Sequence, residues 1–257
     1  MQVEMLGALT MVTANGRLRI PGEKVRTTLA MLALNAGKMV SCDALVDELW
    51  GELPVGNAKN ALQAHIKRLR KLMDRLATEG RYGYQLIQTV DNGYVLELPR
   101  EAVDANRFLD LAAQGARCLD SRPGEAVQLL ERALQLWHGP ALVDIGEGIQ
   151  CRSAASWLDE SRVIAKEDLI TARLALGDER SIVSELDQLV ARYPLRERFT
   201  EQFMLALYRC GRQADALDVY HRIRERLTMD LGLEPGQLLQ QRYQAILAQD
   251  PALVASV

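Results

Sequence analysis

Hydrophobic positions along the chain follow two different periods. Before residue 98, short runs that alternate apolar and polar residues flank segments with helical spacing, whereas beyond it apolar residues recur only every three or four positions. The clearest helical period lies in residues 57–76, where the apolar positions fall on one stripe: Ala58, Leu62, Ile66, Leu69, Met73 and Leu76. We therefore predict an amphipathic helix that packs this stripe against a core.

The predicted helix as a whole is strongly basic. Asp74 is its only acid, and its cations are Lys59, Lys67, Arg68, Arg70, Lys71 and Arg75. A positive helix in a chain whose net charge is −3 indicates a polyanionic partner, with nucleic acid as the first class to test. The alternative is that the cations only solvate an exposed helix.

When such a helix lies in a DNA major groove, the length and position of each side chain decide whether it contacts bases or phosphates. Small and amide side chains near its start approach base edges, while longer cations meet phosphates on either wall. The predicted base contacts are Asn60, Gln63, Ala64 and Lys67. The predicted phosphate contacts are Asn57, Lys59, Arg68, Lys71 and Arg75, with Thr27 and Ser41 added because free amides near helix starts attract anions.

Two shorter helices are predicted ahead of the basic one. Residues 24–36 form an apolar helix that ends at Gly37, and Ser41 can cap a helix over residues 42–50 that ends at Gly51. Three helices in this order, of which the third is the longest and most basic, match a helix-turn-helix core.

Strands are predicted on both sides of these helices. Residues 84–90 and 93–98 form a hairpin around Asp91, Asn92 and Gly93, which would be a wing directly after the third helix. The turn geometry explains Asn92 and Gly93, and the exposed tip with Tyr94 could touch the minor groove or the sugar-phosphate backbone. The first twenty residues, around Asn15 and Gly16, predict a small leading sheet.

Only helices are predicted beyond the hairpin. Their expected ranges are 104–119, 124–137, 154–176, 179–193, 196–210, 213–229 and 237–249. Placing Gly177 on Gly211 gives a shift of 34 residues, the length of a tetratricopeptide repeat, under which apolar residues match apolar residues. Stacked helical pairs of this kind form a concave surface that usually holds proteins or peptides and rarely catalyses.

Two domains are therefore expected, a winged helix-turn-helix over residues 1–98 and a helical domain over residues 99–257. The first carries a net charge of +2 and the second −5, so the basic surface is concentrated on one helix. The predicted fold class is mainly α with a small β component: an OmpR-type winged helix-turn-helix followed by an all-α domain of tetratricopeptide-like repeats.

Several long motifs resemble one family. ELWGELPVGNAKNALQAHIKRLRKLM and DNGYVLEL resemble the DNA-binding half of the SARP family, the Streptomyces antibiotic regulatory proteins, whose output domain is of the OmpR type. ALQLWHGPAL and residues 194–253 resemble the bacterial transcriptional activation domain of that family. The chain ends soon after this domain, so it resembles a small member without the ATPase and sensor modules of larger relatives.

The resemblance implies a sequence-specific transcriptional activator. Its expected partners are double-stranded promoter DNA with direct repeats near the −35 region, bound by a head-to-tail dimer, and RNA polymerase holoenzyme in the region of its sigma factor. The resemblance also implies control of a secondary-metabolite gene cluster in an actinomycete. It does not imply aspartyl phosphorylation, because no receiver domain is present.

Other chemistry finds little support in the sequence. His65, His138 and His221 lack metal-site spacing, the four cysteines show no CxxC pair, and no Walker loop, nucleophile elbow or dinucleotide fingerprint occurs. We therefore expect no catalytic residues, no metal and no cofactor. No apolar run is long enough for a membrane span and no secretory signal is visible, so the expected location is the cytoplasm, at the nucleoid.

Two alternative functions stay open from the sequence. In one, the chain is a protein-interaction adaptor whose winged helix contacts only protein. In the other, it is a regulator whose helical domain senses a small metabolite.

Overall fold

A three-stranded antiparallel sheet opens the fold. The computed structural model describes residues 1–14, 16–51, 56–76 and 83–254. The strands β1 (Gln2–Glu4), β2 (Thr10–Thr13) and β3 (Gly16–Arg19) are hydrogen-bonded in sequence order. Val3 and Met11, which face each other across β1 and β2, are fully buried. The predicted leading sheet is confirmed, while Asn15 of its turn lies outside the described residues.

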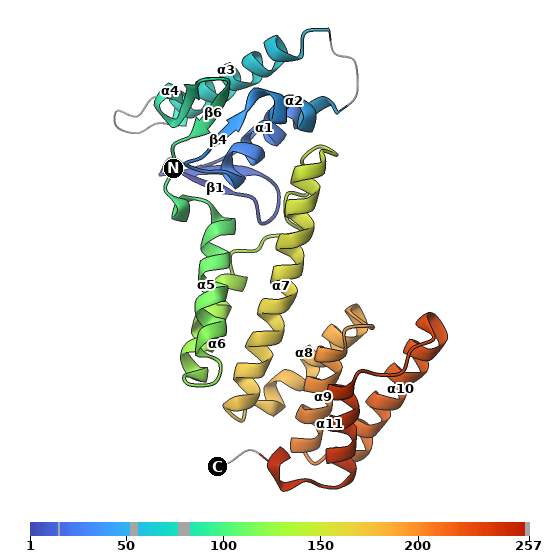
Figure 1. Ribbon diagram of the computed structural model, residues 1–257. Coiled ribbons are helices and arrows are strands. Elements are labelled where there is room, and N and C mark those ends of the chain that lie inside the picture. The colour runs from blue at the N-terminus through green and yellow to red at the C-terminus, as the bar shows by residue number, and fades with distance from the viewer. Residues whose placement is uncertain (15, 52–55, 77–82, 255–257) are drawn as a thin grey trace. The chain divides into compact units, whose positions relative to one another are not determined.

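The three predicted helices follow this sheet (Figure 1). They are α1 (Glu23–Leu34), α2 (Cys42–Trp50) and α3 (Ala58–Leu76), with the short strand β4 (Met39–Ser41) between the first two. Gly37 adopts a φ of 75°, which a side chain would disfavour, and this lets the chain leave α1. The hydroxyl oxygen of Ser41 accepts a hydrogen bond of 3.1 Å from the Ala44 amide, as expected of a capping residue.

The wing is a second small sheet, preceded by a helical turn. The turn is α4 (Gly83–Leu86), and the strands β5 (Ile87–Val90) and β6 (Gly93–Leu96) pair with β4 in the order β4-β6-β5. The prediction of a strand from residue 84 is wrong. Residues 83–86 form the helical turn α4 instead, and strand β5 begins only at Ile87. The second strand also ends earlier than predicted, and β4 was not predicted.

The rest of the chain is helical. Its elements are η1 (Arg100–Ala102), α5 (Asp104–Cys118), α6 (Pro123–Leu134), α7 (Ile149–Ala175), α8 (Glu179–Arg192), α9 (Glu197–Arg209), α10 (Gln213–Leu231), α11 (Gln237–Leu247) and η2 (Pro251–Leu253). Helix α7 begins before the predicted residue 154, and α6 ends before the predicted residue 137. Within the described ranges, no helix is both long and apolar enough to cross a bilayer.

The predicted repeat of 34 residues is visible in the backbone. Gly177 and Gly211 have φ angles of 76° and 78° and each ends a helix of its repeat. In the next helix of each repeat, Leu186 and its counterpart Tyr220 are both buried. Helices α8 and α10 occupy the same position in the two repeats, and both pack on α9.

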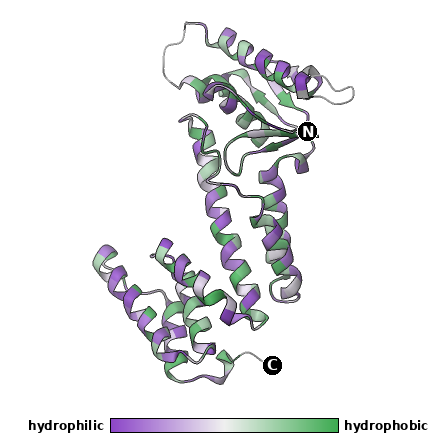
Figure 2. Ribbon diagram, turned by 180° about the vertical axis from the view of Figure 1, so that it is seen from behind, coloured by the Kyte–Doolittle hydropathy of each residue, from purple (hydrophilic) through white to green (hydrophobic). Residues whose placement is uncertain are grey.

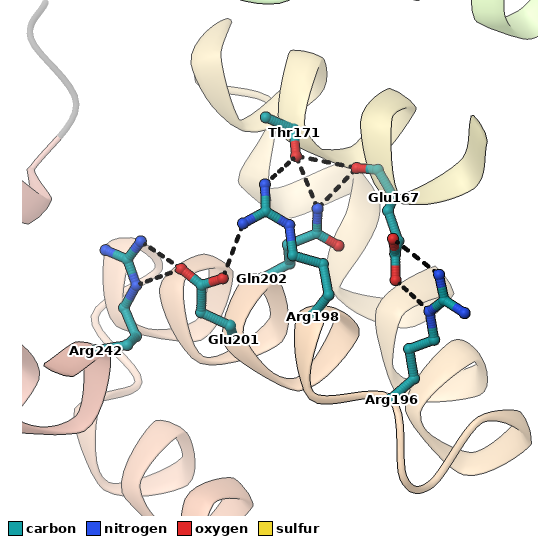
Figure 3. A network of polar contacts seen from close by, with 7 residues as sticks. All are labelled: Glu167, Thr171, Arg196, Arg198, Glu201, Gln202 and Arg242. Carbon is teal, nitrogen blue, oxygen red and sulfur yellow. Dashed lines mark hydrogen bonds and ion pairs between the residues drawn. The ribbon is translucent and has the colours of Figure 1, made fainter. Parts of the chain in front are cut away.

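A polar network joins α9 to α7 and α11 (Figure 3). Arg196, just before α9, donates to the carboxylate of Glu167 on α7 at 2.6 Å and 3.3 Å. The Gln202 amide donates to the Glu167 carbonyl at 2.7 Å, and Arg242 on α11 donates to Glu201 at 2.8 Å. The two arginine–carboxylate contacts are charge-assisted, and together with the Gln202 bond they hold α7 and α11 to α9.

Contacts divide the chain into two compact units. Unit 1 comprises residues 1–113 and 132–163, and unit 2 comprises residues 114–131 and 164–257. Unit 1 thus extends past the division that the sequence predicts at residue 98. The buried carboxylates of Glu48 and Asp104 and the half-buried carboxylate of Asp144 hold the later segments of unit 1 to the winged helix.

Candidate nucleic-acid interface

Helix α3 separates an apolar face from a polar one, as its sequence predicts. Leu62, Ile66, Leu69 and Met73 are at most 2% exposed, while Ala58 is half-buried. Hydrophilic and hydrophobic residues alternate along the helix in Figure 2. The predicted core-facing stripe is thereby confirmed for these residues, and the side chain of Leu76 lies outside the description.

The predicted base-contacting residues all lie on the exposed face of α3. They are Asn60, Gln63, Ala64 and Lys67. Their spacing of three or four residues places them along one side of the helix. Ala64 leaves room between the longer side chains, so the backbone of α3 can come close to a base edge. Asn60 and Gln63 carry the donor and acceptor pair that matches adenine in the major groove.

The predicted phosphate-contacting cations surround this face. Arg68, Lys71 and Arg75 are exposed, and the latter two form no ion pair within the described part of the chain. Lys59 approaches Asp43 at 3.6 Å, with both side chains about two-thirds exposed (65% and 67%). An ion pair in such open solvent is weak, and a phosphate could replace its acid.

Arg70 has a different role from the other cations of α3. Its guanidinium donates to the carbonyl oxygen of Ile87 at 2.7 Å and 3.0 Å, and to the Thr89 hydroxyl at 2.9 Å. It therefore fixes α3 to strand β5 of the wing. The sequence prediction missed this role. Its position beside Leu69, at the edge of the apolar stripe, was the available signal.

The three residues predicted to bind phosphate at helix starts differ in their exposure and in their hydrogen bonds. Asn57 is exposed, and its carbonyl oxygen accepts a bond of 3.1 Å from the Ala61 amide, which fits the start of α3. Ser41 is half-buried and its side chain already caps α2. The prediction for Thr27 is wrong because Thr27 lies inside α1, is 2% exposed, and bonds to the Glu23 carbonyl.

The tip of the wing consists of Asp91 and Asn92, both exposed. Asp91 adopts a positive φ of 46°, and the Asn92 carbonyl oxygen accepts a 2.7 Å bond from the Cys42 amide. Gly93 is required for space, since a Cβ there would lie 2.5 Å from the Val40 carbonyl oxygen. The wing is therefore held tightly against β4, while Asp91 and Asn92 at its tip stay exposed.

Tyr94 points into the protein and not toward a ligand. It pairs with Val40 and Thr89 in the central strand of the wing and is 5% exposed. Burial raises the pKa of its phenol. This placement contradicts the predicted DNA contact by Tyr94, because its side chain belongs to the core of unit 1.

Behind α3, aromatic packing supports the helix. The rings of His65 and Trp50 stack with centroids 5.9 Å apart, and the Lys24 ammonium lies over Trp50 at 5.1 Å. Burial and the neighbouring cations Lys24 and Arg68 lower the pKa of His65. His65 thus packs against Trp50 behind α3. No metal-binding cluster of His, Cys, Asp or Glu occurs among the residues that the structure describes.

Asp104 ties the start of α5 to the leading sheet. Its carboxylate accepts hydrogen bonds from the amides of Met5 at 2.8 Å, Leu6 at 3.1 Å and Ala105 at 2.7 Å. The residue is 4% exposed, and burial outweighs these bonds to raise its pKa to about 6.

Two further carboxylates attach the segment 132–163. Glu48 of α2 accepts 2.9 Å bonds from the amides of Gln150 and Cys151, so it caps the first turn of α7 and explains the early start of that helix. Asp144 accepts from the Leu9 amide at 2.8 Å and lies 3.3 Å from Arg26. The sequence prediction missed all three carboxylates.

Comparisons with known proteins agree with this architecture. Residues 21–96 match the family model described as transcriptional regulatory protein, C terminal, and residues 103–247 match the bacterial transcriptional activator domain. Transcriptional regulator RedD of Streptomyces coelicolor is 49% identical over 98% of this chain and 72% of its own length. Regulatory protein DnrI of Streptomyces peucetius is 35% identical over 98% of this chain and 94% of its own length.

A solved structure has a closely similar fold. Mycobacterium tuberculosis EmbR, in complex with a low affinity phosphopeptide, superposes with a TM-score of 0.92 at 31% identity. The match covers 97% of this chain and 65% of the EmbR chain, so the present chain spans just under two thirds of that protein.

Proposed function

Because the chain belongs to the SARP family of transcriptional activators, we propose that it places α3 in the major groove of direct repeats beside a promoter. The observation that carries this proposal is the exposed face of α3, where Asn60, Gln63, Ala64 and Lys67 lie together above a buried apolar stripe. Such a face combines groups that read bases with a helix that the core holds rigidly.

The cations give the proposed complex its affinity. Arg68, Lys71 and Arg75 hold phosphates along the groove, with Lys59 and Asn57 at the start of the helix. Ser41 supports the complex by capping α2. At the wing, Asn92 at the exposed tip contacts the backbone, while Gly93 supplies the close approach to β4. Residues 1–98 are the proposed DNA-binding part.

We further propose that two protomers bind head to tail. Direct repeats have the same orientation on DNA, so the two bound protomers also have the same orientation. Residues 99–257 then contribute to activation through RNA polymerase holoenzyme, in the region of its sigma factor. The proposed targets are promoters of a secondary-metabolite gene cluster, read in the cytoplasm at the nucleoid. The family membership supports these three points.

A footprint of the purified chain on the intergenic regions next to its own gene tests this function. The expected result is protection of two repeats in the same orientation near the −35 region, with centres about 10 base pairs apart or a multiple of that. Protection of a palindrome would contradict the head-to-tail arrangement. No protection of any fragment at low salt would contradict the proposed DNA-binding role.

A further inference from the structure

Unit 2 carries a groove between α8 and α10. Both helices pack on α9 (Figure 1). The groove between them has a volume of about 480 Å³. Its apolar lining comes from Val190, Ala191, Pro194, Val219, Ile223 and Met229. Met229 is 82% exposed, so an apolar surface is open to a ligand.

A second hollow continues this groove toward the start of α10. It has a volume of about 340 Å³, shares Asp187, Val219 and Arg222 with the first hollow, and reaches Phe203 and Leu207 of α9. The two hollows form one elongated channel that follows α10. We call this channel the α8/α10 groove. Its length suits a segment of polypeptide better than a compact small molecule.

The border of the α8/α10 groove carries unpaired acids. Asp187, Glu225 and Asp230 are exposed and form no hydrogen bond or ion pair with other described residues. Over the two hollows the lining holds five acids and three cations, which leaves a net charge of −2: Asp187, Asp215, Asp218, Glu225 and Asp230 against Arg212, Arg222 and Arg226. The free charge around the groove is therefore negative, and it would repel DNA.

We propose that the α8/α10 groove binds a basic amphipathic helix of a partner protein. The apolar stripe of such a helix would cover Val219, Ile223 and Met229, and its lysines or arginines would meet the three free carboxylates. The basic helix α3 of a second copy does not fit this role, because its apolar stripe is buried in unit 1. The inference does not rest on the proposed DNA site.

The test measures fluorescence anisotropy of a labelled synthetic peptide with the full chain. The peptide has about 18 residues, which span about 27 Å as a helix, with leucines on one stripe and lysines beside it. A second peptide carries glutamate in place of each lysine. The variants are the triple substitution Asp187→Asn, Glu225→Gln and Asp230→Asn, and the single substitution Met229→Ser. These side chains are exposed, so the fold should persist.

The control variant is Asp120→Asn, an exposed acid of unit 2 that does not line the groove. We expect the lysine peptide to bind wild type and Asp120→Asn equally, and the triple variant about tenfold more weakly. Met229→Ser should also weaken binding, and the glutamate peptide should not bind. The proposal would be overturned by equal binding to wild type and the triple variant, by equal binding of both peptides, or by no binding of the lysine peptide to wild type.

Discussion

Arg70 of α3 donates two hydrogen bonds to the carbonyl oxygen of Ile87, the first residue of strand β5. This contact, extended by the bond to Thr89, joins the proposed recognition helix to the wing. A cation that the sequence places on the DNA-facing helix is thus engaged inside the protein. It positions two DNA-binding elements relative to each other, and need not touch DNA.

Replacing Arg70 by alanine should therefore act differently from removing a phosphate contact. We expect Arg70→Ala to lower the free energy of unfolding by about 1–3 kcal/mol, because bonds to a charged donor are lost. DNA affinity should fall while the slope of its salt dependence stays unchanged. Urea denaturation and binding titrations at several salt concentrations measure both quantities. A salt slope that decreases by about one unit would instead assign Arg70 to a phosphate.

Gly93 should tolerate no side chain. In Gly93→Ala the new Cβ would lie 2.5 Å from the Val40 carbonyl oxygen, so β4 and β6 would have to separate. We expect a loss of about 1–3 kcal/mol in the free energy of unfolding. Gly124→Ala is the matched control, since a Cβ there meets no atom within 4 Å and the residue lies in α6. Equal stability of the two variants would contradict the close approach.

Asp104 should make stability depend on pH. Its pKa is raised from 3.8 to about 6 in the folded state, so folding favours the protonated form. The stabilisation is complete below pH 3.8 and is lost as the pH rises through about 6. The difference in free energy of unfolding between wild type and Asp104→Asn should thus change by up to about 3 kcal/mol between pH 4 and pH 7. A constant difference would show that Asp104 does not titrate in this range.

The burial of Tyr94 gives a prediction for DNA binding. Tyr94→Phe should bind promoter DNA as wild type does, because the ring belongs to the core of the wing. Asn92→Ala, at the exposed tip, tests the wing contact in the same titration. Weaker binding by Tyr94→Phe than by Asn92→Ala would show that the wing rearranges on DNA.

The sequence was sufficient to predict the elements whose signals are local. The stripe from Leu62 to Met73, the cap at Ser41 and the glycines at 177 and 211 all depend on neighbours in sequence, and each is confirmed. Periodicity also located the exposed face of α3, although its DNA contacts remain predictions.

The sequence did not reveal features that depend on distant residues. Glu48 caps α7 across 102 and 103 positions, and Asp104 accepts from amides 98 and 99 positions away. Such partners leave no trace in a local pattern, and they explain why unit 1 extends past residue 98. Tyr94 was misplaced for a related reason, because only pairing with β4 shows that its strand is central.

The central claim is that one face of α3 reads bases while its cations hold phosphates. The most direct test measures dissociation constants across a salt series for wild type, Lys71→Ala and Asn60→Ala, on the footprinted promoter and on a scrambled fragment. Lys71→Ala should weaken binding to both fragments and reduce the salt slope by about one unit. Asn60→Ala should mainly lose discrimination between the fragments, by about 1–3 kcal/mol. Binding of both variants indistinguishable from wild type would contradict the assignment of α3 to the groove.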